Sequence, residues 1–220
     1  MTSTLAERFA ELQAERERTW PPEQLAKNAD QRAALVAAFD PATVAQPGSL
    51  LPDTTLVDQD GKAVALSDLL ANGPAVLVFF RFAGCPACNI ALPYYDETLA
   101  APLKAAGIPL VAVSAQNPVD RGIIDRHGLS FPVAGDPDYA LSRALGITFL
   151  PLEQPAVTSG QNWIGATLGT NSYEIDQPAV LIINADRTVC QLWVSPDWLN
   201  LTETGNILAA LSEVSVQAAA

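Results

Sequence analysis

Two cysteines three residues apart, Cys85 and Cys88, are the side chains of this sequence best suited to chemistry. They bound the motif Cys-Pro-Ala-Cys, which follows a near-continuous apolar run and precedes a helical pattern. A helix N-terminus stabilises a thiolate, the reactive form of cysteine, through its free N–H groups and its dipole. Pro86 suits the first helical position, where its missing N–H costs nothing. The order of strand, motif and helix therefore favours redox chemistry at this pair.

The spacing also suggests a different role for each cysteine. Residues three apart lie one turn along the same helix face, within reach of a disulfide bond. We expect Cys85, just before the first turn, to be the exposed attacking thiolate. Cys88 is then the more buried, resolving thiol.

The pair could also bind a metal or be purely structural. A structural zinc site needs two more ligands, and Cys190 and His127 do not form a second close pair. Three cysteines are too few for a cluster held by four thiolates, so no metal and no cofactor is expected. Two inert cysteines packed in the core remain the structural alternative.

The elements around the motif predict an α/β fold. Residues 74–81 and 109–114 are apolar runs of the length of buried strands. A hairpin over residues 50–66 precedes them. Helical patterns, a short strand and two further strands follow, at 90–106, 119–126, 131–133, 136–145, 179–184, 189–194 and 202–214, around an irregular stretch at 147–177. This alternation predicts a central mixed sheet flanked by helices, built partly from parallel crossovers.

Residues 1–48 differ from the rest and are interpreted as an N-terminal helical extension and linker. Leu5, Phe9, Leu12 and Arg16 fall at helical spacing, and a second helical pattern starts near Glu23. Two short helices cannot form a core alone, so they must pack on the main domain or on another subunit. We therefore expect a homodimer, with the α/β domain over residues 49–215 and a flexible tail over 216–220.

Composition narrows the choice of partners and compartment. The 220 residues include 12 Lys and Arg against 24 Asp and Glu, a formal charge of −12. This charge argues against a nucleic-acid partner and against docking on an anionic membrane. The sequence shows neither a signal-type apolar segment nor an apolar run long enough to span a bilayer, so we expect a cytoplasmic protein. Cytoplasmic thiols are normally reduced, which favours a catalytic pair over a structural one.

Residues 50–213 resemble the peroxiredoxin family, of alkyl hydroperoxide reductase and thiol-specific antioxidant type, within the thioredoxin-fold superfamily. The resemblance rests on the segments 51–81, 111–147 and 177–194, with their Phe-Pro and Asp-Pro-Asp landmarks. It implies a thioredoxin-like fold carrying an N-terminal helical extension. It also implies an enzyme in which Cys85 attacks a small hydroperoxide, Cys88 resolves the product, and a thioredoxin-like dithiol regenerates the pair.

The motif departs from the family pattern in ways that leave the reaction open. Phe82 stands where the family usually has Thr or Ser, and the usual Arg near the closing strand is absent. Gln177-Pro178 stands there instead and is similar to the cis-proline of thioredoxins, which would make Pro178 face the cysteines. Arg81 either supplies positive charge to the thiolate or is a solvated strand-end charge, and Phe82 either walls the site or packs in the core. The alternatives are thus a thiol-disulfide oxidoreductase acting on protein disulfides and a non-enzymatic redox switch.

Overall fold

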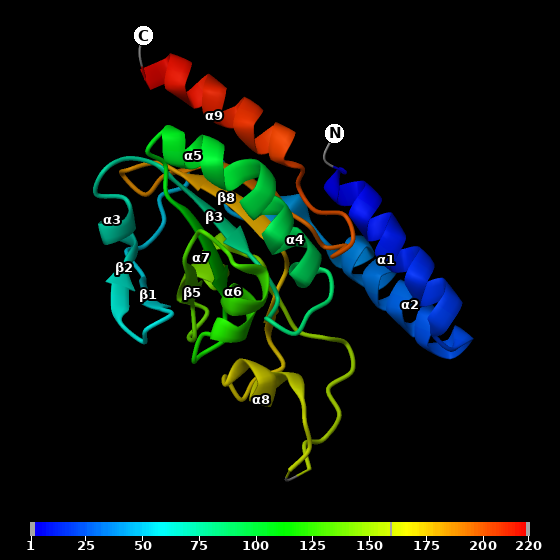
Figure 1. The fold of residues 1–220 in the computed structure, drawn as a ribbon. Coiled ribbons are helices and arrows are strands. Elements are labelled where there is room, and N and C mark those ends of the chain that lie inside the picture. Colours follow the sequence, from blue (N-terminus) through cyan, green and yellow to red (C-terminus); the bar gives the residue numbers. More distant parts are fainter. Residues whose placement is uncertain (1–2, 159, 219–220) are drawn as a thin grey trace.

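A seven-stranded mixed sheet forms the centre of the computed structural model, which describes residues 3–158 and 160–218 (Figure 1). The strand order is β2-β1-β5-β4-β3-β8-β9. The strands are β1 (Thr55–Asp58), β2 (Ala63–Ala65), β3 (Ala75–Phe79), β4 (Leu110–Ser114), β5 (Val133–Gly135), β8 (Ala179–Ile183) and β9 (Val189–Val194). The pairs β3–β4 and β4–β5 are parallel and the other pairs are antiparallel. The mixed sheet and its flanking helices confirm the predicted thioredoxin-like fold.

The central strands alternate their side chains between two hydrophobic clusters. Val76 and Val78 of β3 face one cluster, and Leu77 and Phe79 face the other. All five residues of β3, β4 and β8 are buried, as expected for strands covered on both faces. Both cysteines of the motif belong to the first cluster.

Helices cover both faces of the sheet. The helix after the motif consists of three consecutive parts, with a π-helical turn in its middle: α4 (Cys88–Tyr95), η2 (Asp96–Ala100) and α5 (Ala101–Ala105). The remaining helices of the domain are α3 (Leu66–Leu69), α6 (Arg121–His127), α7 (Ala140–Leu145), α8 (Ile164–Leu168) and α9 (Thr204–Ala218). Within the described residues, no helix is both long and apolar enough to cross a bilayer.

The N-terminal extension packs on its own chain. Helices α1 (Leu5–Thr19) and α2 (Pro22–Ala38) run side by side, and α1 lies against α4 (Figure 1). The turn η1 (Pro41–Thr43) then leads to the sheet. Leu5 and Phe9 are buried in the cluster that contains the cysteines. The apolar stripe of α1 is thus covered without a second subunit. The homodimer stays a prediction, but the need to cover this stripe no longer supports it.

Some element boundaries differ from those predicted. Residues 216–218, predicted as part of a flexible tail, continue α9, and residues 219–220 lie outside the described residues. The stretch 147–177 contains α8 and a two-stranded sheet of β6 (Thr148–Phe149) and β7 (Ile175–Asp176). Strands of two residues are too short to show a hydrophobic period, so their prediction from sequence was not possible.

Candidate active site

The two cysteines lie in the turn that joins β3 to α4. The helix begins at Cys88, two residues after the predicted first helical position, and Pro86 is exposed in the turn before it. The N–H of Asn89 nevertheless donates to the carbonyl oxygen of Cys85 at 3.0 Å, which extends the helical hydrogen bonding back by one turn. Cys85 thus occupies the position of a helix cap, where free N–H groups favour an anion.

The surroundings of Cys85 stabilise its thiolate. A hydrogen bond from the Cys88 thiol is the main cause that lowers the pKa of Cys85, to about 6. Burial opposes this shift, while the charge of Arg81 and the N–H groups of Cys88 and Ala87 add to it. The sulfur therefore holds a negative charge at neutral pH, the state in which it can act as a nucleophile.

Cys88 behaves in the opposite way. Burial raises the pKa of Cys88 well above its ordinary value, and the hydrogen bond to Cys85 raises it further. Cys88 therefore stays a protonated thiol that donates to its neighbour. Both cysteines are free in this structure, so it represents the reduced pair.

The prediction that Cys85 is exposed is wrong. Its relative exposure is 3%, close to the 1% of Cys88. The reason is tertiary: α1 packs against α4, and its buried residues Leu5 and Phe9 belong to the same hydrophobic cluster as the cysteines. The spacing of the motif fixes the local turn but carries no information on which distant helix covers it.

Arg81 lies beside the cysteines and is held by an aromatic ring. Its guanidinium carbon lies 4.3 Å from the ring centre of Trp198, and its charge lowers the pKa of Cys85. Its Nε atom is buried without a hydrogen-bond partner among the described residues. Phe82 is half-buried, and its ring lies 6.0 Å from the Arg81 guanidinium. Both residues thus lie at the cysteine turn, Arg81 as a cation and Phe82 as part of its apolar surroundings.

Pro178 is buried at the start of β8, next to the end of β3. The register pairs Ala179 with Phe79, so Pro178 lies beside the backbone that leads into the cysteine turn. Its peptide bond is not cis, because the cis X-Pro bond of the described residues joins Asn117 and Pro118. Pro178 is therefore similar to the cis-proline of thioredoxins in its position but not in the conformation of its peptide bond.

A polar network that sequence reasoning missed fixes the cysteine turn from the side of α6. The Nδ2 atom of Asn89 donates to the carbonyl oxygens of Ala83 at 2.7 Å and of Cys85 at 2.8 Å. Its Oδ1 atom accepts from Arg126 at 2.5 Å and lies 2.8 Å from Nε2 of His127. Asn89 follows the second cysteine directly, but its partners come from another helix and left no signal in the local sequence.

A second residue that the sequence-based reasoning left without a role is Arg16 of α1. It belongs to the helical stripe of Leu5 and Phe9 and is 5% exposed. Its side chain lies close enough to Cys85 for the two charges to interact. A signal was present in the sequence, because an arginine on the apolar side of an amphipathic helix needs a partner.

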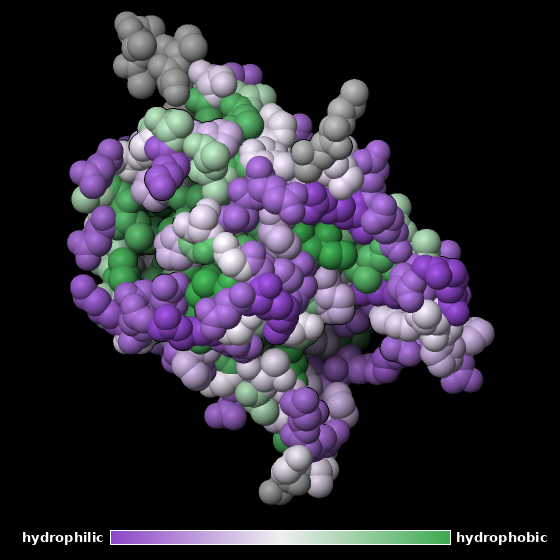
Figure 2. Space-filling view, viewed as in Figure 1, coloured by the Kyte–Doolittle hydropathy of each residue, from purple (hydrophilic) through white to green (hydrophobic). Residues whose placement is uncertain are grey.

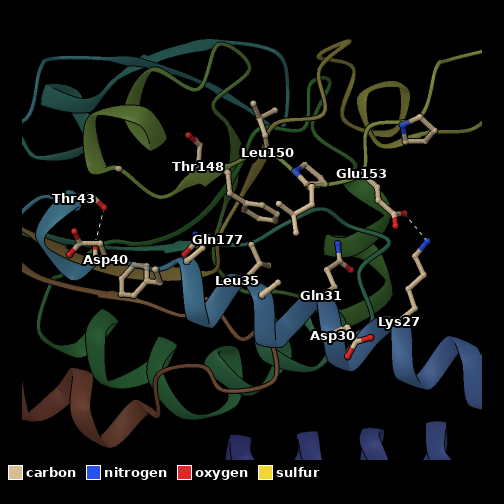
Figure 3. A pocket seen from close by; sticks show the side chains of 18 of the residues that line it. Lys27, Asp30, Gln31, Leu35, Asp40, Thr43, Thr148, Leu150, Glu153 and Gln177 are labelled. Carbon is tan, nitrogen blue, oxygen red and sulfur yellow. Dashed lines mark hydrogen bonds and ion pairs between the residues drawn. The ribbon is translucent and has the colours of Figure 1, made fainter.

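A large cavity lies away from the cysteines. It is a groove of about 1020 Å³ between α2 and the segment 148–155 (Figure 3). Leu35 of α2 and Leu150 both line it, and Lys27 and Glu153 pair over one end at 3.1 Å. Gln177, the neighbour of Pro178, lies at its inner side. No cysteine or histidine lines the groove within the described residues, so it is not the site of the thiol chemistry.

Known proteins resemble this chain in both sequence and fold. The thiol-disulfide oxidoreductase ResA of Halalkalibacterium halodurans is 34% identical over 118 residues, which is 51% of this chain and 64% of the relative. The chain thus matches less than two thirds of the length of this curated relative. The crystal structure of reduced Prx3 from Vibrio vulnificus, solved in complex with H₂O₂, has a TM-score of 0.59 and 25% identity, and the match covers 76% of this chain and 98% of that one. Peroxidoxin BcpB from Mycobacterium tuberculosis has the same fold, with a TM-score of 0.59 and 20% identity over 77% of this chain and 98% of its own.

The family itself follows from a longer match. The Redoxin family model matches residues 46–196, which is more than half of the chain and includes the cysteine turn, the central sheet and Pro178. This match confirms the peroxiredoxin-like resemblance drawn from the sequence. The chain belongs to the Redoxin family.

Proposed function

We propose that this protein is a thiol-dependent oxidoreductase of peroxiredoxin type that reduces small hydroperoxides. One observation carries the proposal: the Cys85 sulfur accepts hydrogen bonds from the Cys88 thiol and from backbone N–H groups beside the Arg81 cation, which lowers its pKa to about 6. A buried thiolate with a protonated thiol as its neighbour has the two components that the reaction needs. The structural likeness to Prx3, which was solved with H₂O₂, supports the same substrate class.

The proposed reaction proceeds in three steps. The Cys85 thiolate attacks one oxygen of the hydroperoxide, the O–O bond breaks, and the leaving alkoxide or hydroxide takes up a proton. The cysteine becomes a sulfenic acid and the hydroperoxide becomes an alcohol or water. The Cys88 sulfur then displaces hydroxide from the sulfenic sulfur, which forms a Cys85–Cys88 disulfide and releases water. A thioredoxin-like dithiol supplies two electrons and two protons to restore both thiols.

A second candidate function is the reduction of protein disulfides by the same pair. The relatives named thiol-disulfide oxidoreductase ResA favour it, as does the presence of both sulfurs in one turn. In that reaction the Cys85 thiolate attacks a partner disulfide, and Cys88 releases the mixed disulfide. The alternative differs from the first in substrate and uses the same cysteines in the same order.

The test is hydrogen peroxide consumption with a thioredoxin system or with dithiothreitol. Wild type is compared with Cys85→Ser and with Cys190→Ser, in which a half-buried cysteine of β9 is changed. We expect turnover in wild type and in Cys190→Ser and none in Cys85→Ser. Absence of peroxide turnover in wild type would overturn the peroxidase proposal. Continued cycling of the pair against a disulfide substrate would then support the second candidate.

A further inference from the structure

Arg16 is a buried cation that pairs with no carboxylate among the residues that the structure describes. Its Nε and Nη1 atoms are both buried and have no hydrogen-bond partner within the described part of the chain. Its guanidinium carbon lies 4.7 Å from the ring centre of Trp20, which leaves those N–H groups unused. Burying an unpaired charge is strongly unfavourable, so a group of opposite charge is required nearby.

The packing of α1 on α4 points to the Cys85 thiolate as this group of opposite charge. The two helices run in opposite directions, and Arg8 of α1 lies over Tyr94, 5.2 Å from its ring centre, and pairs with Glu97. Arg16 lies eight residues further along α1, or about 12 Å at the helical rise of 1.5 Å per residue. The same distance back along α4 from Tyr94 leads to the cysteine turn. Figure 1 shows this end of α1 beside the start of α4.

The charges around Cys85 agree with that placement. Burial lowers the pKa of Arg16, whereas the Cys85 thiolate raises it, which makes Cys85 the anion that partly compensates the buried guanidinium. The other cation near Arg16 is Arg32 of α2, and it is already neutralised by two hydrogen bonds of 2.7 Å to Asp197. Arg81 at the end of β3 and the Cys88 thiol also act on the Cys85 sulfur, and Arg126 and His127 of α6 face the same turn through Asn89.

We propose that Arg16 is a positioning residue of the thiol site, delivered by the N-terminal extension to hold the Cys85 sulfur as a thiolate. The inference rests on the proposed function and adds to it that residues 1–48 complete the site. It also accounts for the missing arginine near the closing strand, since a cation reaches the sulfur from α1 instead. A positive charge beside a developing or fixed negative charge stabilises it most in a dry, closed site.

The test measures the thiolate of Cys85 directly and does not depend on turnover. The reduced full-length protein is alkylated with iodoacetamide between pH 4 and 9, and modification of Cys85 is followed by peptide mass spectrometry. The variants are Arg16→Met, which keeps an apolar stem, Arg16→Lys, which keeps the charge, and Arg18→Met as a control. Arg18 lies on the same helix, its side chain is 72% exposed, and it pairs with Glu15.

The inference predicts that Arg16→Met moves the midpoint of the alkylation profile upward by about one pH unit, a tenfold loss of thiolate below the midpoint. Arg16→Lys should recover at least half of that shift, and Arg18→Met should not move the midpoint. A midpoint within 0.2 units of wild type in Arg16→Met, as a rough threshold, would overturn the inference. If Arg16→Met fails to fold, Arg16→Gln replaces it under the same criterion.

The outcomes also separate this inference from the proposed function. A shifted midpoint in Arg16→Met combined with no peroxide turnover in wild type would retain Arg16 and reject the peroxidase. Normal turnover with an unshifted midpoint would retain the peroxidase and reject Arg16. A purely structural role of Arg16 predicts lower thermal stability in both Arg16→Met and Arg16→Lys, without any change in the pH profile.

Discussion

At the scale of single residues, Asn89 connects the cysteine turn to α6. Its amide donates to two carbonyl oxygens of the turn and accepts from Arg126, so one side chain ties the turn to α6. Asn89→Ala removes these bonds and should lower the free energy of unfolding by about 1–2 kcal/mol. It should also slow the reaction of Cys85, because the turn loses its fixed geometry.

The measurement for Asn89 is urea unfolding together with the alkylation rate of Cys85 at pH 7. Asn206→Ala, in an exposed part of α9, is the matched control and should leave both quantities unchanged. Equal stability and equal rate in Asn89→Ala and wild type would mean that the turn is held by the backbone of α4 alone.

Asp176 is a second residue with an unusual environment, far from the cysteines in sequence. Burial, and after it the nearby Asp136, raises its pKa to about 8. Both carboxylate oxygens are buried without a hydrogen-bond partner among the described residues. The proton that Asp176 keeps in the folded state is lost from the unfolded chain above about pH 4.

The stability of the protein should therefore fall as pH rises through this window. The folded state binds more protons than the unfolded state between about pH 4 and 8, so the free energy of unfolding decreases over that range. Asp176→Asn, which is neutral at every pH, should be less sensitive to pH than wild type between pH 5 and 8. Denaturant unfolding at both pH values tests this, with the exposed Asp138→Asn as control. The same loss of stability in all three proteins would show that Asp176 is already ionised in the folded state.

At the scale of elements, two glycines that end helices offer a matched pair. Gly128 ends α6 and Gly146 ends α7, both in the left-handed conformation, with φ of +59° and +73°. A Cβ atom at Gly128 would meet nothing within 4 Å, whereas at Gly146 it would lie 2.5 Å from the carbonyl oxygen of Thr43. Gly146 therefore allows the segment after η1 to lie directly on the end of α7.

Alanine substitutions at these two positions separate the cost of a left-handed backbone, which both share, from the cost of a steric clash, which arises only at Gly146. Gly128→Ala should cost about 1–2 kcal/mol from the left-handed conformation alone. Gly146→Ala should cost about 1–3 kcal/mol more, because the linker backbone must move. Equal losses in thermal or urea unfolding would mean that residues 43–44 shift freely, and that the linker contributes little to the fold.

Elements that depend on a pattern of neighbouring residues could be predicted from the sequence, whereas contacts between distant residues could not. The strands β3, β4 and β8 are buried on both faces, so they appear in the sequence as apolar runs, and they were predicted closely. The burial of Cys85 in a cluster shared with α1 was not predicted, since it depends on packing between residues about 70 positions apart. Arg16, on the apolar side of α1, was a local sign that the extension packs against a group of opposite charge.

At the scale of the whole molecule, the start of α1 meets the segment that leads into α9. The carboxylate of Glu203, before α9, accepts from the N–H groups of Leu5 and Ala6 at 3.2 and 2.9 Å, and from the hydroxyl of Tyr94 at 2.5 Å. A carboxylate at a helix N-terminus is stabilising, so Glu203 anchors the first turn of α1. Hydrophobic residues show at the surface between the α1 and α4 regions, and others show among polar residues on the α3 and α5 side of this view (Figure 2).

This arrangement makes access to Cys85 a property of the whole chain. If α1 closes the site, loosening α1 should expose the sulfur even though no residue of the motif changes. Phe9→Ala removes a side chain that is 2% exposed and should cost about 3–5 kcal/mol of the free energy that holds α1 and the domain together. Alkylation of Cys85 by a bulky maleimide should then become faster relative to alkylation by the small iodoacetamide.

The ratio of the two alkylation rates is the informative quantity, because it cancels changes in thiolate content. Ala14→Ser, on the exposed side of α1, is the control and should keep the wild-type ratio. An unchanged ratio in Phe9→Ala, with the expected loss of stability, would mean that the maleimide reaches Cys85 by a path that α1 does not cover. A raised ratio would show that the extension closes the site, which makes its release a requirement for any bulky substrate such as a protein disulfide.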